Sequence, residues 1–419
     1  MSTSAAPRPS SPRYDATSTV APAQPTRERL VSLDVFRGLT IAGMLLVNDP
    51  GTWSAIFPPL EHAEWNGWTP TDLIFPFFLF IVGITTYLSM SARRARGDED
   101  SALVKQILRR GIIIYLLGFA MAMFPFYQWG TIAALPNATP WDRIIYRIEH
   151  VRLLGVLPRI GIVYIFAGLL TLKTTLKQQV IIIAALLFGY WFAMTLIPVP
   201  GESEIGALLL HTKDRNLAAW LDRAILGANH IWTGSVTFDP EGPFSTTPAI
   251  ATAMLGSIAG RWIALRDKPL LERIVGLFAA GSLGMVLGLM WNWSFPINKN
   301  LWTSSYVIFT AGMACVSIAT IMWIVDHYNV KWWTKPFVVF GVNPIVAFVG
   351  SGVMARLIYT LWHVNYHGAS VSIQNAMYQI LFASWLPPRV ASLGFALAFV
   401  LMWYGILLVL YKRNIILKV

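Results

Sequence analysis

Apolar residues gather in ten stretches of about 20 residues along the chain, and short polar or charged segments separate them. A helix of this length crosses the roughly 30 Å hydrocarbon core of a bilayer. We therefore predict an all-α polytopic membrane protein, a bundle of about ten transmembrane helices. The predicted spans are approximately 33–49, 73–91, 110–127, 153–172, 178–197, 246–265, 271–291, 302–325, 337–360 and 390–411.

Composition supports a lipid-facing surface. Of the 419 residues, 55% are hydrophobic and only 13% are charged, whereas soluble domains carry about 25% charged residues. The single cysteine, Cys315, excludes an intrachain disulfide and a cysteine-based metal site. Residues 1–29 are rich in Ser, Pro, Ala, Thr and Arg and hold few large apolar side chains. This segment is predicted to be a disordered cytoplasmic tail, and 30–419 a transmembrane domain.

Lysine and arginine residues are concentrated on alternate connections between the predicted spans. With the N-terminus in the cytoplasm, 21 of the 32 fall in cytoplasmic segments, eight in outer segments and three within spans. The positive-inside rule then predicts that both termini are cytoplasmic. The same distribution assigns the net charge of +11 to membrane topology. We therefore expect the lipid bilayer as a partner, and no nucleic acid.

Several polar residues lie inside predicted spans. Asp34 and Arg37 are three residues apart on one helical face, so they can form an ion pair. Alternatively, the planar guanidinium of Arg37 meets a phosphate that enters from the cytoplasm. Arg159 and Asn343 are candidates for a central polar pocket, and they are equally candidates for structural ties between helices.

The outer segment 48–72 holds carboxylates, amides and one histidine, His62, but no Lys or Arg. We expect Thr69 or Thr71 to cap the next helix, with Pro70 in its first turn. An imidazole exchanges protons near neutral pH, and a neighbouring carboxylate can orient it. His62 is therefore a candidate base, although a histidine in a loop is more often simply solvated.

The longest outer loop covers 198–245, with a short amphipathic helix predicted near 214–227. Within it, the run from Asp239 to Pro243 predicts a tight turn. This turn is either solvated, or Asp239 or Glu241 contacts a cationic or hydroxyl-rich substrate. The remaining histidines show no metal-ligand spacing, so no metal site is predicted.

Four motifs around the first two spans are similar to those of one known family. They are Arg29-x-x-Ser32-Leu33-Asp34-x-Phe36-Arg37-Gly38, Val47-Asn48, His62-Ala63-x-Trp65-Asn66-Gly67 and Asp72-Leu73-x-Phe75-Pro76-x-Phe78. Together they resemble the heparan-α-glucosaminide N-acetyltransferase family, in particular its bacterial members. The resemblance extends to Gly155-Val156-Leu157-Pro158-Arg159-Ile160, Asp239-Pro240-Glu241-Gly242 and Gly341-x-Asn343-Pro344. Pro158 departs from the Gln expected in many relatives, which removes a side-chain donor there.

The resemblance implies that 30–419 is a transmembrane acyltransferase domain. Such an enzyme moves an acetyl group from cytoplasmic acetyl-CoA to the amine of a glucosamine-like sugar at the opposite membrane face. It also implies a multi-pass protein of the bacterial inner (cytoplasmic) membrane, and it leaves a homodimer open. An amino-sugar permease and an O-acyltransferase acting on cell-envelope sugars remain alternatives.

The family's active-site residues match three positions here. The family histidine matches His62, the asparagine after the first span matches Asn48, and the carboxylate that opens the second span matches Asp72. We expect His62 to be the base, Asp72 its orienting partner and Asn48 an oxyanion or substrate donor, by direct transfer or through an acetyl-imidazole. The expected acetyl-CoA contacts are Arg37, Arg159 and Asn343. The expected acceptor contacts are Asp239, Glu241 and Asn66.

Overall fold

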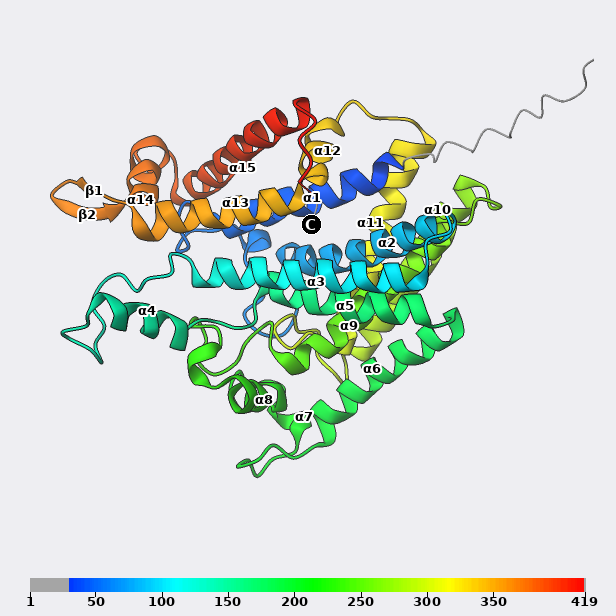
Figure 1. The fold of residues 1–419 in the computed structure, drawn as a ribbon, viewed down its shortest axis with the longest axis horizontal. Coiled ribbons are helices and arrows are strands. Elements are labelled where there is room, and N and C mark those ends of the chain that lie inside the picture. Colours follow the sequence, from blue (N-terminus) through cyan, green and yellow to red (C-terminus); the bar gives the residue numbers. More distant parts are fainter. Residues whose placement is uncertain (1–29, 418–419) are drawn as a thin grey trace, which may run out of the picture.

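The computed structural model describes residues 30–417, so the tail predicted over 1–29 lies outside the described residues. Long helices run side by side in one bundle (Figure 1). They are α1 (Val31–Asn48), α2 (Ile74–Arg94), α3 (Asp100–Met123), α5 (Val156–Lys173), α6 (Leu176–Leu196), α9 (Pro243–Ile263), α10 (Leu270–Trp291), α11 (Ser304–Ile321), α12 (Lys335–Val342), α13 (Pro344–Arg356) and α15 (Pro388–Lys412).

Shorter elements occupy the connections. They are η1 (Pro58–Leu60), η2 (Pro70–Leu73), α4 (Pro140–Glu149), α7 (Gly206–Leu209), α8 (Leu217–Leu226), η3 (Ala228–His230), η4 (Met322–His327), η5 (Leu357–Leu361), α14 (Ile373–Tyr378), η6 (Gln379–Ala383) and the antiparallel hairpin β1 (His363–Tyr366) and β2 (Ala369–Ser372). The amphipathic helix predicted near 214–227 is confirmed as α8. The sequence pattern did not predict α4 or the hairpin, because neither has an apolar run of span length.

Within residues 30–417, nine helical segments are long and apolar enough to cross a membrane. The class of polytopic helical membrane protein is therefore confirmed, while the count of ten and the cytoplasmic termini stay predictions. The stretch 246–265 forms α9, which is rich in small and hydroxyl side chains and largely buried. The span predicted over 337–360 is broken at Asn343, because Pro344 cannot donate a backbone hydrogen bond.

Helix α9 lies at the centre of the bundle and contacts α2, α5, α6 and α11. Its approach to α2 depends on two glycines. A Cβ on Gly83 would lie 1.9 Å from the Ala253 carbonyl oxygen, and one on Gly256 would lie 2.1 Å from the Phe80 carbonyl oxygen. Small residues allow such close contact between helices in membranes. This packing fixes α2, whose N-terminal end carries the residues described below.

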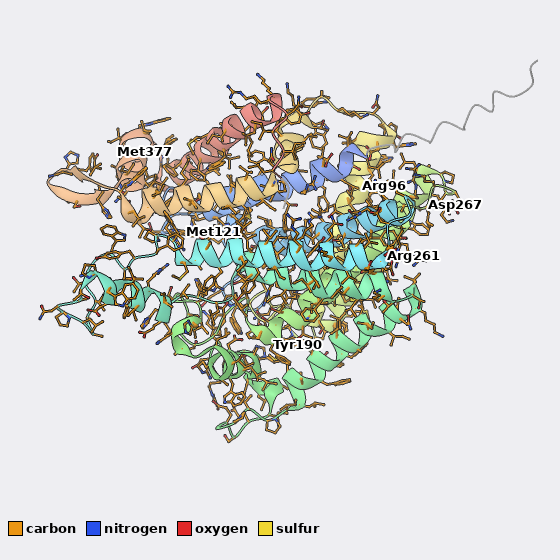
Figure 2. The ribbon with its side chains drawn as sticks, viewed as in Figure 1. Arg96, Met121, Tyr190, Arg261, Asp267 and Met377 are labelled. Carbon is orange, nitrogen blue, oxygen red and sulfur yellow. The ribbon has the colours of Figure 1, made fainter. Side chains whose placement is uncertain are left out.

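The two ends of the bundle differ. Arg96, Arg261 and Asp267 lie at one end, where α1 begins, and Met377 lies near the other (Figure 2). At the first of these ends Arg37 Nη2 contacts Asp34 Oδ1 at 2.6 Å, so the predicted ion pair is confirmed. After α15 the chain turns back to Asn343, which donates to the Ile415 carbonyl at 2.9 Å and accepts from the Leu417 amide at 3.0 Å.

Candidate active site

The segment between α1 and α2 fixes the carboxylate of Asp72. Thr69 caps η2 in a reciprocal capping box with Asp72, and Pro70 occupies the first turn, as predicted. Oδ2 of Asp72 accepts the backbone N–H groups of Ala63 and Thr69, each at 3.0 Å. Because one carboxylate oxygen is held by the backbone, the other is left for a side chain.

That side chain is His62. Its Nδ1 lies 2.7 Å from Asp72 Oδ1. Asp72 is almost completely buried, whereas 47% of the His62 side chain is exposed. An ionised carboxylate only accepts hydrogen bonds, so Nδ1 carries the proton and Nε2 presents a lone pair. The carboxylate fixes both the tautomer and the ring orientation, as a general base requires.

A lysine that the sequence analysis did not select completes the cluster. Lys299 Nζ lies 3.1 Å from each ring nitrogen of His62 and 3.8 Å from Asp72 Oδ1. Burial lowers the pKa of the Lys299 ammonium, and the nearby charges of Asp72 and Glu241 partly oppose this effect. Lys299 is 237 positions from His62 along the chain, so no local motif could have indicated their contact.

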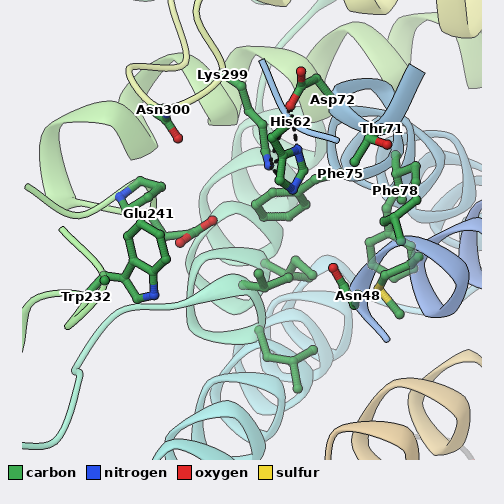
Figure 3. A pocket seen from close by; sticks show the side chains of 18 of the residues that line it. Asn48, His62, Thr71, Asp72, Phe75, Phe78, Trp232, Glu241, Lys299 and Asn300 are labelled. Carbon is green, nitrogen blue, oxygen red and sulfur yellow. Dashed lines mark hydrogen bonds and ion pairs between the residues drawn. The ribbon is translucent and has the colours of Figure 1, made fainter. Parts of the chain in front are cut away.

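These groups lie at one end of a cavity of about 640 Å³. Figure 3 shows Glu241 and Trp232 on one side of it, His62 and Lys299 on another, and Asn48 across from them. Deeper in the bundle the lining is mainly apolar, with side chains from α1, α2, α5 and α13: Ile41, Met44, Phe78, Ile160, Ile345 and Phe348. A polar end and an apolar interior are typical of small-molecule sites.

The turn at 239–242 is confirmed, with the Gly242 amide donating to the Asp239 carbonyl at 2.9 Å. It is not solvated, because both carboxylates are buried. Arg152 pairs with both of them, and its Nε lies 2.8 Å from Asp239 Oδ2. Burial raises the pKa of Asp239. The pKa of Glu241 is lowered, since the attraction of nearby cations, Arg152 above all, outweighs its burial. Glu241 lines the cavity, and Asp239 supports the turn from behind.

Four other predicted site residues do not line the cavity. Arg159 is fully buried beneath the turn at 239–242, where it donates to Ser245 and, at 3.3 Å, to the Gly242 carbonyl. Asn66 bonds to His211 at 2.9 Å and to Asn298 at 3.1 Å. Arg37 and Asn343 make the contacts given above. The structure thus brings Asn48, His62, Asp72 and Glu241 to one cavity, and the ligand contacts assigned to the other residues stay predictions.

The cluster supplies the parts that acyl transfer needs. His62 offers an oriented proton acceptor, while the Asn48 amide and the Lys299 ammonium are donors at the surface of the same cavity. Within residues 30–417, no group of three His, Cys, Asp or Glu side chains could hold a metal ion.

Comparison with known proteins adds an independent observation. Residues 29–224 match the family model described as "Heparan-alpha-glucosaminide N-acetyltransferase, catalytic", a range that includes Asn48, His62 and Asp72. The chain is 30% identical over 381 residues to heparan-alpha-glucosaminide N-acetyltransferase of Mus musculus and 29% identical over 382 residues to that of Homo sapiens. Each alignment covers 80% of this chain and 55% of the relative.

A shorter match covers 102 residues of an uncharacterized 39.9 kDa protein of Bacillus acidopullulyticus, at 28% identity. It includes 23% of this chain and 29% of that protein. The chain spans about half the length of the two N-acetyltransferases it matches.

Proposed function

Because the chain belongs to the heparan-alpha-glucosaminide N-acetyltransferase family, we propose that it is a membrane-embedded, acetyl-CoA-dependent N-acetyltransferase. Its acceptor is the amine of a glucosamine-like sugar at the membrane face opposite to the cytoplasm. The observation that carries this proposal is the pair of His62 Nδ1 and Asp72 Oδ1, 2.7 Å apart at the polar end of a deep cavity.

In the proposed reaction, His62 Nε2 removes a proton from the sugar ammonium. The freed amine attacks the thioester carbonyl, and the carbonyl oxygen takes up negative charge that the Asn48 amide stabilises. The C–S bond then breaks, and the leaving thiolate takes the proton from the His62 imidazolium. The neutral imidazole next accepts the second proton, which the newly acylated nitrogen loses as it becomes an amide, and passes it to water. The exposed Nε2 is equally suited to a two-step path through an acetyl-imidazole.

The shape of the cavity supports the placement of the two substrates. Its apolar interior, between α1, α2, α5 and α13, suits the narrow acyl-pantetheine arm of acetyl-CoA. At the polar end, Glu241 is the acceptor contact we retain, because its carboxylate lines the cavity opposite His62 (Figure 3). Asp239 and Asn66 bond to other side chains instead, Asp239 to Arg152 and Asn66 to Asn298.

The charged head of acetyl-CoA fits the basic end of the bundle, where Arg37 and the segment 93–110 lie. We do not extend this part of the proposal to Arg159 and Asn343. Arg159 is buried at the end of the bundle that carries His62, and the Asn343 amide is bonded to the C-terminal segment.

The experiment is product analysis with purified protein in detergent. We expect CoA release from acetyl-CoA only when glucosamine is added, and mass spectrometry should find N-acetylglucosamine. Acetylation restricted to hydroxyl-bearing acceptors would replace the proposal with an O-acyltransferase. Uptake of glucosamine into proteoliposomes without acetyl-CoA, together with no CoA release, would replace it with a permease.

A further inference from the structure

Lys299 reaches His62 from the loop between α10 and α11, which lies outside the range matched by the family model. We propose that Lys299 is a catalytic residue whose ammonium stabilises the oxyanion formed on the thioester carbonyl when an amine held at His62 attacks. This inference rests on the proposed acetyl transfer and adds to it a second donor, opposite Asn48 in the cavity.

The geometry leaves the ammonium available to a ligand. Nζ is 3.1 Å from both ring nitrogens of His62, so one of its three N–H groups can donate to the Nε2 lone pair. The Nδ1 proton already goes to Asp72. A substrate ammonium can replace Lys299 at Nε2, and the N–H donors of the Lys299 ammonium can turn towards a carbonyl oxygen beside it.

The loop that carries Lys299 is held rigidly. Asn298 is fully buried. Its side-chain oxygen accepts the Leu301 backbone N–H at 2.9 Å, and its backbone N–H donates to the Thr303 hydroxyl at 3.0 Å. The Trp302 amide donates to the Lys299 carbonyl at 3.1 Å. These bonds fix the backbone on both sides of Lys299, so little reorganisation accompanies the reaction.

Two bridges tie this loop to the segment that carries His62. The Asn298 side chain donates to Asn66 Oδ1 at 3.1 Å, and the Gly67 amide donates to the Ile297 carbonyl at 2.7 Å. Asn66, expected from the sequence to contact the acceptor, thus acts as a positioning residue for the pair of His62 and Lys299. The two groups are separated in sequence but are held as one unit.

The charge and the burial of the Lys299 ammonium suit it to stabilise an oxyanion. Asp72 at 3.8 Å balances the ammonium, and only 18% of the Lys299 side chain is exposed, so its charge is weakly screened by water. During attack the π electrons of the carbonyl move onto oxygen, and Lys299 donates a hydrogen bond to it. When the C–S bond breaks, the carbonyl re-forms and His62 protonates the thiolate. The neutral imidazole then takes the second proton from the amide nitrogen and releases it to water. Lys299 keeps its proton throughout.

The test begins with wild-type protein, acetyl-CoA and glucosamine, with CoA release followed by a thiol reagent. An inactive wild type would refute the proposed function itself. With an active wild type, Lys299→Met should lower kcat by about a hundredfold to a thousandfold, the usual effect of losing one oxyanion donor. The KM for glucosamine should change by less than about threefold, because the donor acts only in the transition state.

Lys177→Met is the matched control, since it removes an exposed lysine that does not line the cavity. We expect it to lower kcat by less than about threefold, because this side chain lies outside the site in which the reaction is proposed to occur. A Lys299→Met enzyme that keeps more than a third of wild-type kcat would overturn the inference. So would a loss confined to KM, which would indicate acceptor binding.

A second variant separates chemistry from folding. Lys299→Cys is made with Cys315→Ala, because Cys315 is the chain's single native thiol. Alkylation of the purified protein by 2-bromoethylamine then rebuilds a side chain of lysine length that ends in an ammonium. After excess reagent is removed, kcat should rise at least about tenfold over the same protein before alkylation. No rise in the fully alkylated protein would contradict a role for the charge.

Discussion

His62 and Asp72 are joined by a 2.7 Å contact between Nδ1 and Oδ1, although they lie ten positions apart on either side of a surface loop. The other oxygen of Asp72 is occupied by two backbone amides. The Asp72 carboxylate is therefore held in one position, and it orients the His62 imidazole. This relationship distinguishes His62 from a histidine that happens to face water.

Asp72→Asn should separate orientation from folding. The amide is isosteric, but it no longer attracts the Nδ1 proton as a carboxylate does, so the wrong tautomer is favoured. We expect kcat to fall by about a hundredfold to ten-thousandfold, by analogy with the loss of the orienting carboxylate in serine-protease triads. Acetyl transfer at saturating acetyl-CoA measures this effect.

The control for that variant is His62→Ala, which should abolish turnover while the melting temperature changes little, since the side chain is half exposed. An active His62→Ala enzyme would exclude the imidazole as base or nucleophile. Asp72→Asn with wild-type kcat would show that orientation by the carboxylate is not needed.

The sequence predicted the parts of the site that lie close together along the chain. His62, Asp72 and the Thr69 cap fall within one segment, so their types and spacing were informative. The contact of Lys299 with His62 depends on how the loop after α10 packs on the loop before α2. No periodic pattern of apolar and polar residues in the sequence can indicate such a contact. For the same reason, Arg159 and Asp239 suggested ligand contacts, whereas tertiary packing buries both.

The break at Asn343 shows the same limit for the fold. The hydropathy pattern predicted one span over 337–360, because the residues before and after Asn343 are both apolar. The structure ends α12 at Val342 and starts α13 at Pro344. Pro344 alone indicated a kink or a break. In the folded protein Asn343 bonds to residues of the C-terminal segment, which are too far along the chain for a local pattern to include.

Arg152→Met should destabilise the protein strongly. Arg152 pairs with Asp239 and Glu241, and both carboxylates are buried. Without the guanidinium two negative charges would remain buried and unpaired, a change that typically costs about 3–5 kcal/mol. Thermal unfolding in detergent should show a clear fall in melting temperature.

Arg215→Met, which breaks the exposed 2.6 Å pair with Glu202, is the matched control, and its melting temperature should differ little from that of the wild type. Equal stability of the two variants would contradict the structural role of Arg152.

Asp222 gives the protein a pH-dependent stability. Burial raises the pKa of this carboxyl to about 7 in the folded protein, from an ordinary value of 3.8. The folded state therefore binds more protons than the unfolded state between these two values. This contribution to stability is full below the unfolded pKa and is lost as pH rises towards 7. Asp222→Asn removes the titration.

The difference in melting temperature between Asp222→Asn and wild type should thus shift in favour of the variant from pH 5 to pH 8. The asparagine can still accept the Asp239 amide, which lies 2.9 Å from Asp222 Oδ2, so the comparison isolates the charge. A difference that is constant over this range would show that Asp222 keeps the same protonation state in the folded and unfolded protein.

Gly83→Ala tests the close packing of α2 on α9 that supports Asp72. The new Cβ would lie 1.9 Å from the Ala253 carbonyl oxygen, and backbone cannot move aside as a flexible side chain can. Overpacking of this kind typically costs about 1–3 kcal/mol, so the melting temperature and acetyl transfer should fall together.

Gly189→Ala in α6 is the matched control, because a Cβ there meets no atom within 4 Å. It should be neutral or slightly stabilising, since alanine is favoured over glycine by up to about 1 kcal/mol within a helix. If Gly83→Ala were as stable as Gly189→Ala, the two helices would have room to separate, and their glycine contact would not be what holds the N-terminal end of α2 in place.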